Sequence, residues 1–349
     1  MAVAAHIQPA PGSLRSILVK NSTTRLFVHP LEWTIDHLNF LNVKVVTSTS
    51  IMEPVVEEDK LGAYESIHQA LKRKHLSKII RYLETKISPC SSRDSAMREY
   101  IKTTAIIQKL HPMEAQMSFA YSRCQYATFP PIILAWHDFP FLNNHPGTPI
   151  WAYTDQTWIN TARRKRYRWK PRSYATEQIK NKEELAIDPV YVAILISLAK
   201  DKKRESETPG LQETDSLQVT LFVPEHEFLP HTRGRRETKL VQYTAKISNT
   251  YLQKFEDPYK FFDASLHIEK KMLPTSKPNM VLQAIETAIH DLCGPSKPEP
   301  SRSGSSRSGS SEPLSPAPIL KRKALTELKS DVGGQILDSK RRKVCSVDE

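Results

Sequence analysis

Two segments of the chain alternate between apolar and polar residues. Residues 217–223 place Gln218 and Thr220 between apolar neighbours, and residues 241–247 do the same with Gln242, Thr244 and Lys246. A period of two is typical of a strand with one face on a core and the other toward water. We therefore expect two strands joined by a long exposed loop over 224–237, and a third strand over 266–273.

Other segments repeat their apolar residues with the helical spacing of three and four. These segments are residues 61–88, 92–111, 189–202 and 278–293. Pro89 and Pro112 stop the first two. Asp188 and Pro189 open the third, because the Asp carboxylate accepts free amide bonds and Pro needs none in the first turn. The sequence predicts an α+β fold with a helical N-terminal half and a small, mainly antiparallel sheet flanked by helices.

Composition divides the chain into three parts. Residues 1–20 are small and Pro-bearing, and we expect a flexible N-terminus there. Residues 21–294 hold the periodic segments and form the predicted globular region, in which a further boundary near 150–185 stays open. Residues 295–349 are rich in Ser, Pro and Gly and contain too few apolar residues to order themselves. We expect this last part to be a disordered basic tail.

Charge narrows the class of partner. The chain has 50 Lys and Arg against 38 Asp and Glu, a net charge of +12, which favours acidic partners such as nucleic acid or acidic protein surfaces. No CxxC pair occurs, and no apolar stretch approaches the length of a membrane span. We expect an intracellular protein with no membrane among its partners.

The predicted tail carries two clusters of Lys and Arg. They are Lys321, Arg322 and Lys323, and then Lys340, Arg341, Arg342 and Lys343. Short basic clusters on an exposed arm are typical of signals that an import receptor binds. The spacer is longer than in the usual bipartite signal, so we expect the second cluster to act alone. The alternative is a basic tail that is merely solvated. We predict a nuclear or nucleocytoplasmic protein with an import receptor among its partners.

The most basic stretch of the globular region interleaves cations with aromatic residues. It comprises Arg163, Arg164, Lys165, Arg166, Tyr167, Arg168, Trp169, Lys170 and Arg172. Cations can neutralise phosphates while Tyr167 and Trp169 stack on exposed bases, the combination that single-strand binders use. The alternative is a solvated helix end whose two aromatic residues anchor it to the core. We treat the run as the candidate nucleic-acid interface, open also to an acidic protein.

One enzymatic hypothesis competes with this interpretation. Glu237 and Lys239 share a strand face, and Asp215 heads the preceding strand with matching parity, a set suited to Mg²⁺-dependent phosphodiester hydrolysis. The same Glu-x-Lys spacing also begins at Glu58, Glu84, Glu269 and Glu327, so it carries little information. The leading interpretation assigns no catalytic residue, no cofactor and no metal ion.

Three segments within residues 188–258 resemble an uncharacterised family of filamentous-fungal proteins. The segments are DPVYVAILISLAK, LQVTLFVP and LVQYTAKISNTYLQKFEDP. The resemblance includes no catalytic motif and implies a protein without assigned activity, encoded in some cases among fungal secondary-metabolism genes. Three hypotheses follow, in order of preference: a non-enzymatic nuclear interaction or regulatory protein, a Mg²⁺-dependent nuclease, and an accessory protein of fungal secondary metabolism.

Overall fold

The chain divides into two units, residues 1–297 and residues 298–349. The computed structural model describes residues of the first unit, namely 8–24, 26–48, 63–84, 90–108, 110–115, 117–122, 124–130, 132–137, 148–206, 215–228, 236–275 and 278–293. The predicted tail, with both of its Lys and Arg clusters, lies outside these residues. Among the helices of the described ranges, none is both long and apolar enough to cross a membrane.

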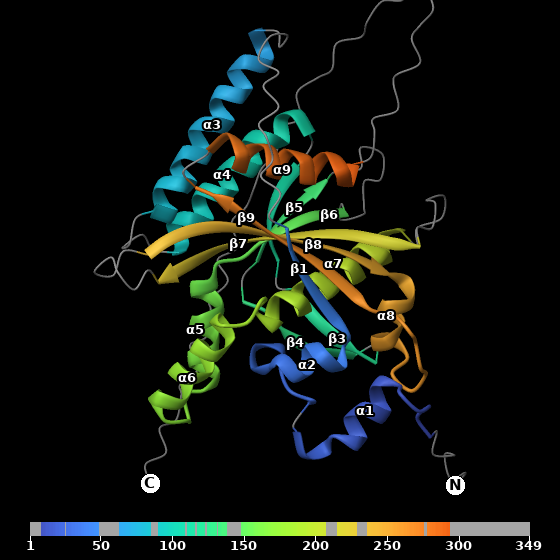
Figure 1. The fold of residues 1–349 in the computed structure, drawn as a ribbon. Helices are drawn as coiled ribbons and strands as arrows, with labels where there is room; N and C mark the ends of the chain where they lie inside the picture. Colours follow the sequence, from blue (N-terminus) through green and yellow to red (C-terminus); the bar gives the residue numbers. More distant parts are fainter. Residues whose placement is uncertain are drawn as a thin grey trace, which may run out of the picture. The chain divides into compact units, whose positions relative to one another are not determined.

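A mixed sheet forms the centre of the first unit (Figure 1). Within the described residues its strands are ordered β1-β9-β8-β7-β6-β5-β2. Neighbouring strands are parallel in the β1–β9 and β6–β7 pairs and antiparallel elsewhere. The bounds are β1 (Val43–Ser48), β2 (Leu110–Ala115), β5 (Ile132–His137), β6 (Thr148–Tyr153), β7 (Ser216–Phe228), β8 (Arg236–Ser248) and β9 (Leu266–Pro274). A separate small sheet pairs β3 (Ser118–Tyr121) with β4 (Cys124–Thr128).

The strands β7 and β8 confirm the two alternating segments of the sequence. Their ladder runs without a break from the pair Ser216 and Ser248 to the pair Phe228 and Arg236. Both strands therefore continue into the segment that we predicted to be a long loop. The two strands extend this far because each supplies the main-chain hydrogen-bond partners that the other needs.

One face of the sheet packs on α7 (Pro189–Ser206), as the sequence pattern predicted. The amide of Val190 donates to the Asp188 carboxylate over 3.0 Å, which is the expected cap. From Val190 to Ala199 every residue of α7 is buried. Around it lie α1 (Leu14–Lys20), α2 (Ile35–Phe40), α8 (Asn249–Glu256) and two short 3₁₀ turns, Ser22–Thr24 and Pro30–Glu32.

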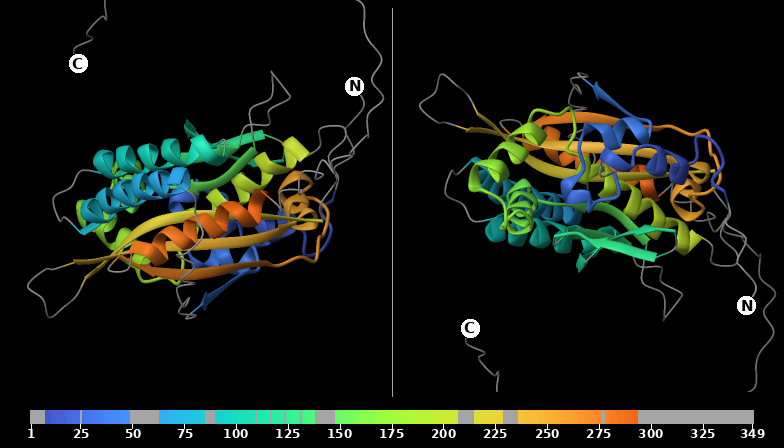
Figure 2. Two further views of the ribbon diagram at one scale, coloured as in Figure 1. Left: turned by 90° about the horizontal axis from the view of Figure 1, so that it is seen from above. Right: turned by 90° about the horizontal axis from the view of Figure 1, so that it is seen from below.

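The opposite face is covered by α3 (Ala63–Glu84), α4 (Cys90–Gln108) and α9 (Pro278–Cys293). The view from above in Figure 2 shows α3 in blue and α9 in orange lying across this face. Ile79, Met97 and Ile285 of these helices are fully buried against Phe222 and other apolar residues of the sheet. The sheet is therefore sandwiched between two helical layers, each with its own apolar core.

Two predictions for the first half of the chain need correction. The helical N-terminal half is not confirmed, since β1 to β6 all end before residue 154. The segment 8–20 is not a flexible end, because α1 forms there and main-chain bonds tie it to the domain: the Ala10 amide to the Tyr259 carbonyl over 2.9 Å, and the Arg15 amide to the Pro258 carbonyl over 2.8 Å.

Candidate functional site

The basic run of the sequence folds as a helical hairpin at the edge of the domain (Figure 1). Its first arm is α5 (Gln156–Arg166) and its second is α6 (Arg172–Glu183), joined by residues 167–171. Asp155 starts the hairpin by accepting the Thr157 amide over 2.8 Å. Four basic residues occupy the last turn of α5, where the helix dipole favours positive charge. We call residues 156–183 the basic hairpin.

Two residues of the predicted interface lie inside the protein. Arg163 is 0% exposed, with its guanidinium bonded to Asp188 and to the Leu31 carbonyl. Tyr167 is also buried, which raises the pKa of its hydroxyl to about 12. Neither side chain can contact a nucleic acid. The interface prediction is corrected at these two positions. The alternative, in which both aromatic residues anchor the run to the core, holds for Tyr167 but not for Trp169, which is exposed.

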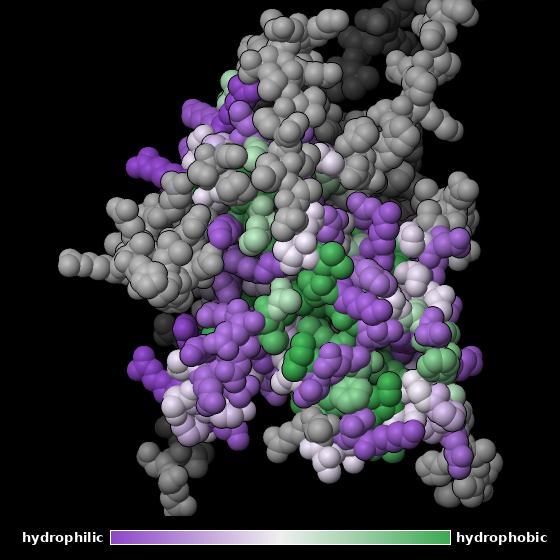
Figure 3. Space-filling model, viewed as in Figure 1, coloured by the Kyte–Doolittle hydropathy of each residue, from purple (hydrophilic) through white to green (hydrophobic). Residues whose placement is uncertain are grey.

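The remaining cations of the basic run differ in whether they form an ion pair. Arg166 forms an ion pair with Glu32 of the preceding 3₁₀ turn. Five further cations are exposed: Arg164, Lys165, Arg168, Lys170 and Arg172. None of the five forms an ion pair with another residue of the described ranges. The lower left of Figure 3, where α5 and α6 lie in the same view of Figure 1, is strongly hydrophilic.

Trp169 occupies the turn between the two arms and is 82% exposed. The guanidinium carbon of Arg168 lies 4.7 Å from the centroid of its ring, a cation–π contact. Tyr167 is buried because it lies four residues after Arg163 and shares the inner face with it. Trp169, two residues farther along, does not lie on that face. The turn therefore presents one indole and its neighbouring cations to solvent.

The three residues of the nuclease hypothesis are not brought together. The β7–β8 ladder places Ser216, next to Asp215, at one end and the pair Glu227 and Glu237 near the other. Twelve residues separate Asp215 from the position opposite Glu237, which at roughly 3.3 Å per residue is on the order of 40 Å. Among the described side chains, no group of three or more His, Cys, Asp or Glu is placed to hold a metal ion.

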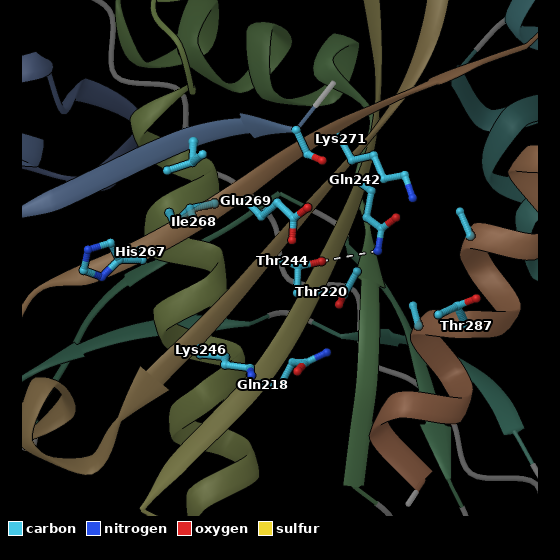
Figure 4. Close-up of a pocket in the computed structure, with 14 residues that line it drawn as sticks. Gln218, Thr220, Gln242, Thr244, Lys246, His267, Ile268, Glu269, Lys271 and Thr287 are labelled. Atoms are coloured by element: carbon cyan, nitrogen blue, oxygen red, sulfur yellow. Dashed lines mark hydrogen bonds between the residues drawn. The ribbon is translucent and has the colours of Figure 1, made fainter. Parts of the chain in front are cut away.

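A polar groove on the α9 side of the sheet was not singled out by sequence reasoning. It has a volume of about 690 Å³ and is lined by polar side chains of β7, β8 and β9 together with α9. Gln218, Thr220, Gln242 and Thr244 lie in it (Figure 4), and these are the polar positions of the two alternating strands. The signal was present, but each strand alone looked like an ordinary solvated face.

The candidate site thus combines an exposed indole with five exposed cations on an anchored hairpin, and a separate polar groove lies across the sheet from α7. The basic tail cannot be placed, because it lies outside the described residues. Comparisons with protein-family models, with curated proteins and with solved structures found no match to this chain.

Proposed function

We propose that the protein is a non-enzymatic interaction protein that binds single-stranded nucleic acid through the tip of its basic hairpin. The observation that carries the proposal is the 82% exposure of Trp169 among exposed cations. An indole left in water gains nothing for folding, because burial of apolar area is what stabilises a fold. On a binding surface the same ring supplies a large, rigid contact.

The chemistry of the tip favours a phosphodiester strand over an acidic protein. Arg164, Lys165, Arg168, Lys170 and Arg172 can each neutralise a phosphate, and Trp169 can stack on a base between them. Stacking needs no base-specific hydrogen bond, so we expect little sequence preference. An acidic protein surface would use the same cations but does not place a planar group beside every negative charge, as a nucleic acid strand does.

The hairpin is held ready for binding. Arg163 fixes the inner face of α5 to Asp188, and Tyr167 packs edge-on against Tyr174 of α6 with ring centroids 5.6 Å apart. Because the two arms are tied to each other and to the domain, binding does not have to order them. An interface that is organised in advance loses less free energy on association.

The test is fluorescence anisotropy with a labelled oligo(dT) strand and the full chain at low salt. Trp169→Ala should weaken binding by roughly 5- to 150-fold, the equivalent of about 1–3 kcal/mol per stacked base, while Trp169→Phe should retain part of the affinity. Phe261→Ala is the matched control, because Phe261 is an exposed aromatic residue, 56% exposed, that lies outside the hairpin. Equal affinity of Trp169→Ala and the parent would reject the proposal.

Nuclear import through Lys340 to Lys343 remains part of this proposal. A protein that binds nucleic acid and enters the nucleus would act as an interaction or regulatory subunit there. The support is the density of the basic cluster and the Ser-, Pro- and Gly-rich sequence before it. The alternative assignment, a nuclease, is not favoured, since the described part of β7 and β8 keeps Asp215 far from Glu237.

A further inference from the structure

The polar groove begins where the apolar cover of the sheet ends. On the α9 face, Leu240 and Leu273 lie directly opposite each other and are buried in the helical layer. Two residues farther along the same strands come Gln242 and Lys271, also opposite each other, and both line the groove. The change from leucine to polar residues on one continuous face of the sheet marks the border of the groove next to Leu240 and Leu273.

The helix that faces these positions does not fill the space. Residues Ala284 and Ala288 of α9 line the groove with side chains of a single carbon, and Thr287 adds a hydroxyl. In Figure 4, Thr287 of α9 stands across from the sheet residues that line the groove. At about 690 Å³ the groove lies within the range of roughly 300–1,000 Å³ that is typical of small-molecule sites.

One hydroxyl in the groove has no partner. Thr220 is 0% exposed, and its Oγ1 forms no hydrogen bond. A buried hydroxyl without a partner costs free energy, and a bound molecule that hydrogen-bonds to it would remove that cost. Beside it the Gln242 amide nitrogen donates to Thr244 Oγ1 over 3.3 Å, and Figure 4 shows the Gln218 amide on the same side. The groove floor therefore offers hydrogen-bonding groups to a bound molecule.

Charges are arranged at separate points of the groove. Glu269 lies directly opposite Thr244, in the same cross-strand row as Thr220. Lys271 lies in the next row toward the apolar border, and Lys246 lies in the next row the other way. The two lysines are thus about four residues apart along the strands, roughly 13 Å. Two ammonium groups flank one carboxylate, with neutral amides and hydroxyls between them.

We propose that this groove binds a nucleoside phosphate. A lysine ammonium suits a phosphate as a point charge, and Glu269 suits the hydroxyls of a ribose, as an acidic residue does in dinucleotide sites. The Gln218 and Gln242 amides each carry a donor and an acceptor, the pattern that pairs with a base edge. The inference does not depend on the basic hairpin, which lies on other elements of the fold.

The experiment is isothermal titration calorimetry of the full chain with adenosine 5′-monophosphate, adenosine and ribose 5-phosphate as separate probes. Adenosine 5′-monophosphate should bind more tightly than either part, because it alone engages both the amides and a lysine. Thr220→Val should weaken its binding roughly tenfold through the lost hydrogen bond. The same variant without ligand should melt no lower than the parent, because the unsatisfied hydroxyl is gone. Thr176→Val, on exposed α6, is the control and should bind as the parent does.

Three results would overturn the inference. The first is no heat from adenosine 5′-monophosphate at millimolar concentration. The second is equal binding of ribose 5-phosphate, which would remove the base from the proposal. The third is parent-like binding by Thr220→Val together with loss in Trp169→Ala, which would move the nucleotide to the basic hairpin. Loss in Thr220→Val with parent-like binding in Trp169→Ala supports the groove.

Discussion

Arg163 and Asp188 form a buried ion pair with two hydrogen bonds, in which the guanidinium nitrogens Nη1 and Nη2 lie 2.6 and 2.5 Å from the carboxylate oxygens Oδ2 and Oδ1. The same carboxylate caps α7 by accepting the Val190 amide. One side chain therefore starts the central helix and holds α5 in place. Through it, the candidate interface is fixed to the most deeply buried helix of the domain.

Replacement of Asp188 by Asn should be strongly destabilising. The amide can still accept the Val190 bond, but it leaves the Arg163 charge buried without a counter-charge. Breaking a buried pair in this way typically costs about 3–5 kcal/mol. Urea unfolding of the parent and the variant measures the difference. Asp257→Asn removes a partner of exposed Lys260 and should cost less than about 1 kcal/mol; a similar small loss for Asp188→Asn would contradict the role given to the pair.

A second prediction concerns pH. Asp94 accepts a hydrogen bond from Trp158 Nε1 over 2.6 Å, and its burial raises the pKa of the carboxyl from an ordinary 3.8 to about 6. Between these values the folded state binds more protons than the unfolded state, so stability falls as the pH rises from about 4 to 6. Since part of the group meets water, we expect a loss of about 1–2 kcal/mol. Asp94→Asn should remove this loss and be the more stable protein at neutral pH.

The comparison is the free energy of unfolding of the parent and Asp94→Asn at several pH values from about 4 to 7. His37 would add a slope of the opposite sign, because burial lowers the pKa of its imidazole to about 4 and the folded state then resists protonation. That contribution is common to both proteins and cancels in their difference. A difference that does not change with pH would show that Asp94 titrates at its ordinary value.

The sequence predicted the elements whose pattern is local. The alternation over β7 and β8 and the Asp188–Pro189 start of α7 need only nearest neighbours to be recognised. By contrast, β1 pairs with β9, which lies more than two hundred residues later. The helix predicted over 92–111 is confirmed as α4 up to Gln108, but its predicted end is wrong, since β2 begins at Leu110 and contains Pro112. Within the described sheet β2 is an edge strand, where a proline without an amide donor is tolerated.

The candidate sites show the same difference between local patterns, which a sequence reveals, and long-range contacts, which it does not. Counting cations identified the basic hairpin, but only the packed structure separates buried Arg163 from exposed Arg164. For the groove, each strand contributes polar residues that alone look solvated. They can be recognised as part of a groove only once the strand register places Thr220, Thr244 and Glu269 in one row and α9 is seen to line the space above them. Register and layer contacts are long-range properties, which a single sequence does not reveal.

A third prediction tests the basic tail. In cells, the full chain with a bulky fluorescent tag should accumulate in the nucleus. The four-residue change Lys340→Ala, Arg341→Ala, Arg342→Ala and Lys343→Ala should leave it in the cytoplasm, because the receptor loses its cationic contacts. The matched control replaces Lys321, Arg322 and Lys323 by Ala and should keep the nuclear signal. An unchanged distribution of the four-residue variant would remove the basis for nuclear import.

The last prediction separates the roles of charge and stacking at the basic hairpin. Each phosphate contact to a single strand contributes about −0.7 to the slope of log affinity against log salt, so five contacts would give about −3.5. Arg168→Ala should make the slope shallower by about 0.7. Trp169→Ala should lower affinity at every salt concentration without changing the slope, because a neutral indole releases no counterion. Anisotropy titrations with oligo(dT) between about 0.05 and 0.3 M salt measure both effects. If Arg168→Ala leaves the slope unchanged, Arg168 does not neutralise a phosphate, and its place over the Trp169 ring serves only to orient the indole.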